Sequence, residues 1–205
     1  MNEKTAQFSL RGLFQPRDLT EGTPWKTILA FALPIIISYL LQQVYTISDA
    51  AIVGQTLTAG EVAGVNDTTS IIFIFLQFAF GVSAGFCVVT AAEVGAHHEA
   101  GVRRSLAAQI LLSAALTVLL TGLALLLLKP MLAWINVTPE SPEVYRAAHT
   151  YCAIIFAGIG AQLFYNFICS FLRSMGDSVT PLLFLLFSTI LNIGLDLLFI
   201  VSFHW

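Results

Sequence analysis

Two aspartates lie within long apolar stretches of the sequence, where a charged side chain is unexpected. Asp49 is the only charged residue in the stretch 27–53, and Asp196 is the only one in the stretch 181–203. A charged side chain inside a membrane costs at least about 2.5–3.5 kcal/mol on insertion scales. Ionisable residues at such positions are therefore functional candidates.

Each aspartate has a polar residue four positions before it: Tyr45 precedes Asp49, and Asn192 precedes Asp196. In an α-helix such residues lie on one face, one turn apart. The helical rise puts Asp49 about 30 Å and Asp196 about 22 Å from the starts of their stretches, at comparable depth. Two carboxylates with amides in one cavity suit Na⁺ or a shared proton. The alternatives are that Asp49 caps its helix or reaches the membrane interface, and that Asp196 is structural.

Asn166 forms a third pair of this kind, with Gln162 four positions before it. A single amide inside a helix bundle more often joins two helices than binds a ligand, so Asn166 and Asn192 gain weight only together with the aspartates. The sequence has no H-E-x-x-H motif, no G-x-S-x-G motif and no phosphate-binding glycine loop. We therefore expect no catalytic residues and no cofactor, and an intramembrane enzyme is disfavoured.

The composition indicates the elements that hold these residues. Of the 205 residues, 57% are hydrophobic and 10% are charged, against roughly 25% charged in soluble domains. The mean hydropathy is +0.84, and the formal net charge is −3. These values exclude a soluble globular enzyme, a disordered chain and a nucleic-acid binder, and they indicate an integral membrane protein whose first partner is the lipid bilayer.

The apolar stretches are long enough to cross a bilayer, which takes about 20 helical residues. After a polar tail over 1–25, five spans are expected in the region 26–205, at about 27–53, 70–92, 105–128, 147–171 and 181–203. Continuous aliphatic blocks argue against the alternating pattern of a membrane β-barrel. The predicted fold class is all-α, a polytopic transmembrane helix bundle.

The positions of Lys and Arg predict the orientation. With five spans, the N-terminal tail and the loops 96–104 and 172–180 share one side and hold seven of these residues, whereas the other side holds Lys129 and Arg146. This asymmetry predicts a multi-pass protein of the cell membrane with a cytoplasmic N-terminus and Trp205 outside. The two aspartates then lie in the outer half of the membrane.

Two backbone features are also expected to shape the bundle. Gly81 and Gly85 form a G-x-x-x-G step, which predicts a close approach of two helices. Pro34 lies inside the first span, where it removes a backbone hydrogen bond and should bend the helix. The bend is either a hinge or a static kink.

Three stretches together resemble the multidrug and toxic compound extrusion (MATE) family, within it the DinF-like branch. The first span contains Phe-Ala-Leu-Pro at 31–34 and Gln-Gln-Val-Tyr-Thr-Ile-Ser-Asp at 42–49. The loop at 172–181 reads Leu-Arg-Ser-Met-Gly-Asp-Ser-Val-Thr-Pro, and the last span contains Leu-Asn-Ile-Gly-Leu-Asp at 191–196. The resemblance extends from about residue 26 to the end of the chain.

The resemblance implies a fold of twelve helices in two six-helix lobes and an antiporter that exports cationic, amphipathic drugs in exchange for Na⁺ or H⁺. It implies that Asp49, Asn192 and Asp196 form the cation-binding and coupling site of the N-terminal lobe, where Na⁺ would be the bound metal. Tyr45 and Asn166 would line the same cavity. The resemblance favours a hinge at Pro34.

The chain departs from the family in length. It holds five spans where a family lobe has six, so the sixth helix and the second lobe are missing. We therefore expect a fragment of the antiporter that does not transport alone. One alternative is a lipid-linked saccharide flippase of the same superfamily, although no Lys or Arg lies within the spans to meet a pyrophosphate. Another is a small, non-transporting membrane subunit that assists assembly.

Overall fold

The computed structural model describes residue 19 and residues 22–202, and the side chains of these residues as far as residue 199. Within this part the chain is helical and forms no strand. The helices are α2 (Pro24–Thr56), α3 (Ala59–Gly95), α4 (Glu99–Trp134), α5 (Pro142–Ala157), α6 (Ile159–Ser174), α7 (Val179–Asp196) and the π-helix η1 (Leu197–Ser202). The all-α bundle expected from the composition is confirmed.

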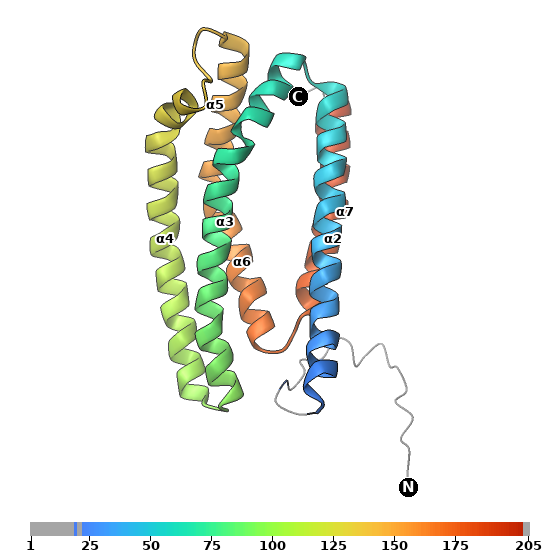
Figure 1. Ribbon diagram of the computed structural model, residues 1–205, viewed down its shortest axis with the longest axis vertical. Helices are drawn as coiled ribbons and strands as arrows, with labels where there is room; N and C mark the ends of the chain where they lie inside the picture. Colours follow the sequence, from blue (N-terminus) through green and yellow to red (C-terminus); the bar gives the residue numbers. More distant parts are fainter. Residues whose placement is uncertain (1–18, 20–21, 203–205) are drawn as a thin grey trace.

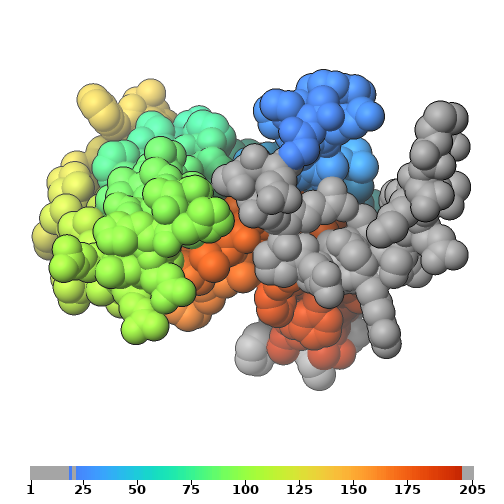
Figure 2. All heavy atoms as spheres, turned by 90° about the horizontal axis from the view of Figure 1, so that it is seen from below, coloured from blue at the N-terminus to red at the C-terminus, as the bar shows by residue number. Residues whose placement is uncertain are grey.

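The helices form two groups that lie side by side (Figure 1). Helices α3, α4, α5 and α6 pack against one another, whereas α2 packs against α7 and η1. Seen from the end at which α2 begins, called here the lower end, α3 and α4 lie on one side and α2 on the other, with α6 between them (Figure 2). The groups share little direct packing, which is mainly that of α6 with α7.

The hydrophobic core lies within the four-helix group. Its fully buried residues come from α3 to α6, and the rings of Phe75 and Phe156 pack at 5.0 Å between centroids. By contrast, the buried residue of α2 is Ser38, and those of α7 are Pro181 and Thr189. Helices α2 and α7 are therefore covered by other helices much less than the members of the four-helix group are.

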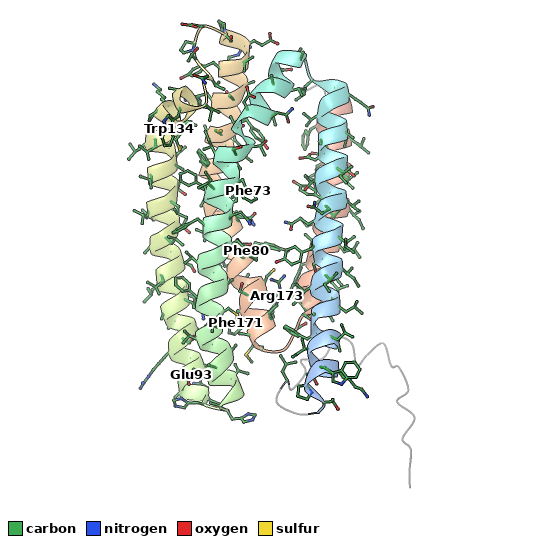
Figure 3. All side chains as sticks on the ribbon, viewed as in Figure 1. Phe73, Phe80, Glu93, Trp134, Phe171 and Arg173 are labelled. Atoms are coloured by element: carbon green, nitrogen blue, oxygen red, sulfur yellow. The ribbon has the colours of Figure 1, made fainter. Side chains whose placement is uncertain are left out.

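The outer surface of the bundle is apolar. Leu126 and Val118 of α4 are 80% and 75% exposed, and Trp134 at the upper end of α4 is 91% exposed (Figure 3). A water-soluble protein rarely exposes apolar side chains over so wide a surface. Four described helices are long and apolar enough to cross a membrane, and the pair α5 and α6 makes a fifth if it is counted as one span.

The fourth expected span, 147–171, is a broken helix. α5 ends at Ala157, α6 begins at Ile159, and the two helices meet at 44°. Gly158 caps α5 and its backbone N–H donates to the carbonyls of Ile154 and Ile155. The two glycines at 158 and 160 are the sequence signal for this break.

The expected close approach at Gly81 and Gly85 is wrong. A Cβ atom added at either position would meet no atom within 4 Å, so no described helix packs there. The close approach lies instead at Gly64, where a Cβ would stand 2.8 Å from the carbonyl oxygen of Val144 and 3.0 Å from the amide nitrogen of Ala148. α3 and α5 therefore come together at Gly64, backbone against backbone.

Two irregular points lie on the α2 and α7 pair. Helix α2 continues through Pro34, and the hydroxyl of Ser38 donates to the Pro34 carbonyl at 2.9 Å. Helix α7 ends at Asp196, where the chain changes to the π-helix η1. Single turns of π-helix are frequent at functional sites. The end of the last expected span, at Phe203, and Trp205 lie outside the described residues.

Candidate ion-coupling site

The side chains of Asp49 and Asp196 meet between α2 and α7. Their carboxyl groups lie within hydrogen-bonding reach of each other, and both residues are half-buried. Asp49 lies near the upper end of α2, and Asp196 is the last residue of α7. Because α2 and α7 pack along each other, two residues with comparable depth in the sequence become neighbours in space.

Two tyrosines accompany the carboxyl pair. Tyr45, one turn before Asp49, interacts electrostatically with both aspartates, so these three residues share one region between the helices. Tyr151 comes from α5 in the other helix group, and it interacts electrostatically with Asp49 and Tyr45. Tyr151 was missed by the sequence analysis because no acidic residue lies one turn from it. The only indication of Tyr151 in the sequence was that a tyrosine lies within an expected apolar span.

Two oxygen atoms near this pair have no hydrogen-bond donor among the described residues. They are Oδ1 of Asn192 and Oδ2 of Asp196, and both are shielded from solvent. An unpaired buried oxygen is costly, and each such atom in a folded protein needs an explanation. Both atoms are hydrogen-bond acceptors, so a proton or a hard cation that prefers oxygen ligands would supply the missing partner.

Asn166 occupies a different place in the structure. It is buried on α6, and its Oδ1 accepts a hydrogen bond from Nε2 of Gln162 at 3.1 Å. Its Nδ2 has no partner in the described part of the chain. No described contact joins Asn166 to the carboxyl pair, so the structure brings together Asp49, Asp196 and Tyr45 but leaves Asn166 in the four-helix group.

This arrangement can hold a small cation but offers no metal centre of the usual protein type. Among the described residues, no group of three or more His, Cys, Asp or Glu side chains converges. Two facing carboxyl groups in a site of low polarity repel each other when both are ionised. A proton or one monovalent cation between them removes that repulsion, so the pair is suited to binding and releasing a single positive charge.

The sequence was then compared with those of known proteins. The MatE family model matches residues 34–198, most of the chain. The chain belongs to the MATE family. It is 31% identical over 193 residues to the probable multidrug resistance protein YpnP of Bacillus subtilis, and 27% identical over 171 residues to the probable multidrug resistance protein YoeA of the same organism.

Solved structures agree on the fold. A MOP superfamily transporter from Pyrococcus furiosus matches with a TM-score of 0.80 and 25% identity, over 90% of this chain and 40% of that one. An outward-facing multidrug resistance MATE family transporter matches with a TM-score of 0.83 and 24% identity, over 91% of this chain and 41% of that one. The resemblance to MATE proteins stated from the motifs is confirmed, and so is the bundle of a MATE N-terminal lobe.

The match covers only part of each relative. The chain is covered for 91% and 83% of its length, but it spans 41% of YpnP and 36% of YoeA. MATE proteins are membrane transporters rather than enzymes, and the several apolar helices of this chain fit that class. More than half of the length of each relative therefore lies outside the match.

Proposed function

We propose that this chain is the N-terminal lobe of a Na⁺- or H⁺-coupled antiporter that exports cationic, amphipathic compounds. The observation that carries the proposal is the contact between the carboxyl groups of Asp49 and Asp196, with buried, unsatisfied oxygens beside it. The similarity to two probable multidrug resistance proteins supports the substrate class. The chain spans about 40% of its relatives, so transport requires a second lobe.

The mechanism follows from the charge of the pair. When Na⁺ or H⁺ binds between Asp49 and Asp196, the repulsion between the carboxylates disappears and the site loses its attraction for a cationic drug, which is released. When the ion leaves, the negative pair attracts the next cationic compound. Exchange of the two cations at one site couples the flow of one to the other, and the lobes rock between the two membrane faces.

The orientation is part of the proposal. The lower end of the bundle carries Lys26, Arg103, Arg104 and Arg173, so we place it on the cytoplasmic side of the cell membrane. The coupling site near the upper ends of α2 and α7 then lies toward the outside. An ion enters it from the side where Na⁺ and H⁺ are usually more concentrated.

Substitution of the aspartates in a full-length version, with its second lobe, tests the transport role. The assay follows efflux of the fluorescent cation ethidium from membrane vesicles under an imposed Na⁺ or pH gradient. Asp49→Asn and Asp196→Asn are expected to abolish ion-driven efflux, whereas Asp67→Asn, the same change at an exposed position of α3, should leave it unchanged. Full ion-driven efflux by Asp49→Asn would contradict the proposal.

Ion binding is tested on the 205-residue chain alone, because the residues of the proposed site, Asp49, Asn192 and Asp196, all lie in it. A ligand that binds only the folded state raises the unfolding temperature as its concentration increases. In detergent micelles, Na⁺ or a lower pH should raise the unfolding temperature of the unaltered chain and of Asp67→Asn, but not that of Asp49→Asn. An equal rise in all three would show that the aspartate pair is not the ion site.

A further inference from the structure

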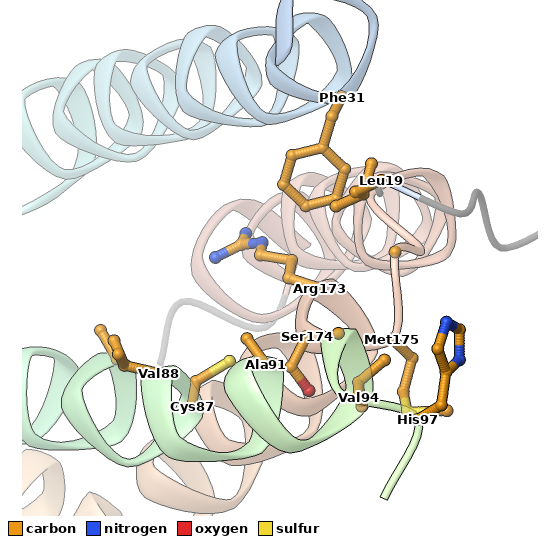
Figure 4. A pocket seen from close by; sticks show the side chains of 13 residues that line it. Leu19, Phe31, Cys87, Val88, Ala91, Val94, His97, Arg173, Ser174 and Met175 are labelled. Atoms are coloured by element: carbon orange, nitrogen blue, oxygen red, sulfur yellow. The ribbon is translucent and has the colours of Figure 1, made fainter. Parts of the chain in front are cut away.

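A second polar feature lies at the lower end of the bundle, far from the aspartate pair. A pocket of about 480 Å³ opens between α2, α3 and the end of α6. Apolar side chains form most of its wall, and Arg173, in the last turn of α6, reaches into it (Figure 4). The sequence analysis had placed Arg173 in a loop, whereas the structure turns its side chain into the space between the two helix groups (Figure 3).

The guanidinium group of Arg173 has no anionic partner in the described part of the chain. Its Nε atom is buried and makes no hydrogen bond. Of the described acidic residues at this end, Glu99 lies exposed at the start of α4, and the other two have partners of their own. Glu93 pairs with His98 at 2.7 Å, and Asp177 accepts from the backbone N–H groups of Val179 and Thr180 at 3.1 and 2.9 Å. A polar atom buried without a hydrogen bond is costly, so the half-buried Arg173 side chain calls for an anion that the described part of the chain does not supply.

The depth of the pocket matches the level of lipid phosphates. Helix α3 has 37 residues and is about 55 Å long, so it extends beyond the hydrocarbon core of about 30 Å. Cys87, which lines the pocket beside Arg173, lies five residues, about 8 Å, before the lower end of the expected span 70–92, and the lining residues Val94 and His97 lie beyond that end. The pocket therefore lies at the boundary between acyl chains and headgroups.

The wall above and around the guanidinium is suited to an acyl chain. Phe31 of α2 and Val88 and Ala91 of α3 line the pocket with carbon, while Arg173 supplies the charge. A planar guanidinium binds phosphate oxygens with two parallel hydrogen bonds, which a lysine cannot do. Cation and apolar wall together recognise an amphiphile with an anionic phosphate head rather than a free cation or a neutral drug.

We propose that this pocket binds the phosphate headgroup of an anionic phospholipid, with Arg173 as the binding residue and the acyl chain along Phe31 and Val88. The bound lipid fills the gap between α2 and α3, two helices that barely touch each other directly. It thus joins the α2 and α7 pair to the four-helix group at the lower end. This site is independent of the aspartate pair and of the transport that we propose for it.

The thiol of Cys87 provides the readout. Cys87 is half-buried and lines the pocket, whereas Cys152 and Cys169 are buried, so labelling of the folded chain by N-ethylmaleimide occurs at Cys87. The chain in detergent micelles is labelled with added dioleoylphosphatidylglycerol, with dioleoylphosphatidylcholine, or with inorganic phosphate alone. The anionic lipid is expected to slow labelling, while the zwitterionic lipid and inorganic phosphate leave it nearly unchanged.

Arginine variants identify the binding residue. Arg173→Gln should raise the lipid concentration for half-protection by about tenfold or more, the contribution of one charge-assisted hydrogen-bonded contact. Arg103→Gln, at an exposed arginine of the same end, should behave as the unaltered chain. If Arg173→Gln does not fold, Arg173→Lys, which keeps the charge but loses the bidentate geometry, should show weakened protection.

Several outcomes would overturn the proposal. They are absence of protection by the anionic lipid, equal protection in the Arg173 variants, equal protection by phosphatidylcholine, and protection by inorganic phosphate alone, which would indicate a site for free anions. Native mass spectrometry gives a second measurement. One bound phosphatidylglycerol should remain on the unaltered chain and on Arg103→Gln, and its persistence on the Arg173 variants would also contradict the assignment.

Discussion

Tyr151 on α5 lies close enough to Asp49 on α2 for the two side chains to interact electrostatically, although their helices belong to different groups. The two groups share little packing, so this relationship places a polar group of the four-helix core beside the carboxyl pair. A tyrosine hydroxyl can donate a hydrogen bond to a carboxylate or accept one from its protonated form. Tyr151 is therefore placed to sense which charge state the pair has.

Tyr151→Phe removes this hydroxyl and keeps the ring. The electrostatic interaction of the hydroxyl with Asp49 is then lost, so the ion concentration for half-maximal efflux by a full-length version should change by roughly two- to tenfold, which corresponds to about 0.4–1.4 kcal/mol. Tyr145→Phe is the control, because Tyr145 lies on the same helix and its ring packs near that of His149 instead. Equal ion dependence in both variants would exclude a role of Tyr151 at the site.

The two aspartates could be found from the sequence because a charged residue inside a long apolar stretch can be recognised without knowing the structure. Asp49 and Asp196 each interrupt a long apolar stretch, and their depth could be estimated from the helical rise. Tyr151 carries no such signal, since tyrosine is common in membrane spans and its partner comes from another helix. Contacts between helices depend on packing, which the pattern of one helix does not encode.

The glycines show the same limit. The spacing of Gly81 and Gly85 predicted a helix contact that the described residues do not make, whereas Gly60 and Gly64, which have the same spacing and were not singled out in the sequence, lie tightly against α5. The four-residue spacing of two glycines indicates a helix face without side chains, but it does not indicate which helix, if any, packs against that face. The break at Gly158 was not predicted, because a bent helix pair has the same average hydropathy as one straight span, and the glycines at 158 and 160 were its only signal.

Gly64→Ala should destabilise the bundle. The added Cβ would lie 2.8 Å from the Val144 carbonyl oxygen and 3.0 Å from the Ala148 nitrogen, and backbone atoms cannot rotate away as a side chain can. Overpacking of this kind costs about 1–3 kcal/mol. The free energy of unfolding, measured by denaturation in mixed micelles, should fall by this amount.

The matched control is Gly81→Ala, which places the same methyl group in open space on the same helix. Alanine is favoured over glycine in a helix by about 0.5–1 kcal/mol, so stability should be equal or higher. Equal losses at both positions would mean that the α3 and α5 contact is not as close as described.

Gln109 joins α3 to α4 through a buried polar network. Its Nε2 donates to the Phe86 carbonyl at 3.0 Å and to the hydroxyl of Ser105 at 3.1 Å, and it also bonds Thr90. Gln109→Leu removes these bonds at similar volume. Bonds of this kind inside membranes contribute about 0.6 kcal/mol on average and up to about 1.7 kcal/mol, so a loss of about 1–2 kcal/mol in unfolding free energy is expected.

Gln77→Leu is the comparison for Gln109, since Gln77 lies exposed on α3. The exposed Gln77 makes no hydrogen bond within the described part of the chain, so its replacement should not lower the stability. Should Gln109→Leu prove as stable as Gln77→Leu, the network would contribute nothing to the packing of α3 on α4.

Pro34→Ala tests the proposed hinge. Proline lacks an N–H, so the carbonyl four residues before it in α2 has no backbone donor at this point, and the Ser38 hydroxyl occupies the Pro34 carbonyl as well. Alanine restores the bond and stiffens the helix that carries Asp49. Ion-driven ethidium efflux by a full-length version should fall severalfold, while the unfolding temperature stays equal or rises.

Pro130→Ala, at an exposed proline inside α4, should raise stability without slowing efflux. Efflux that is unchanged in Pro34→Ala would show that the proline is a static feature of α2, because a hinge must act during the transport cycle.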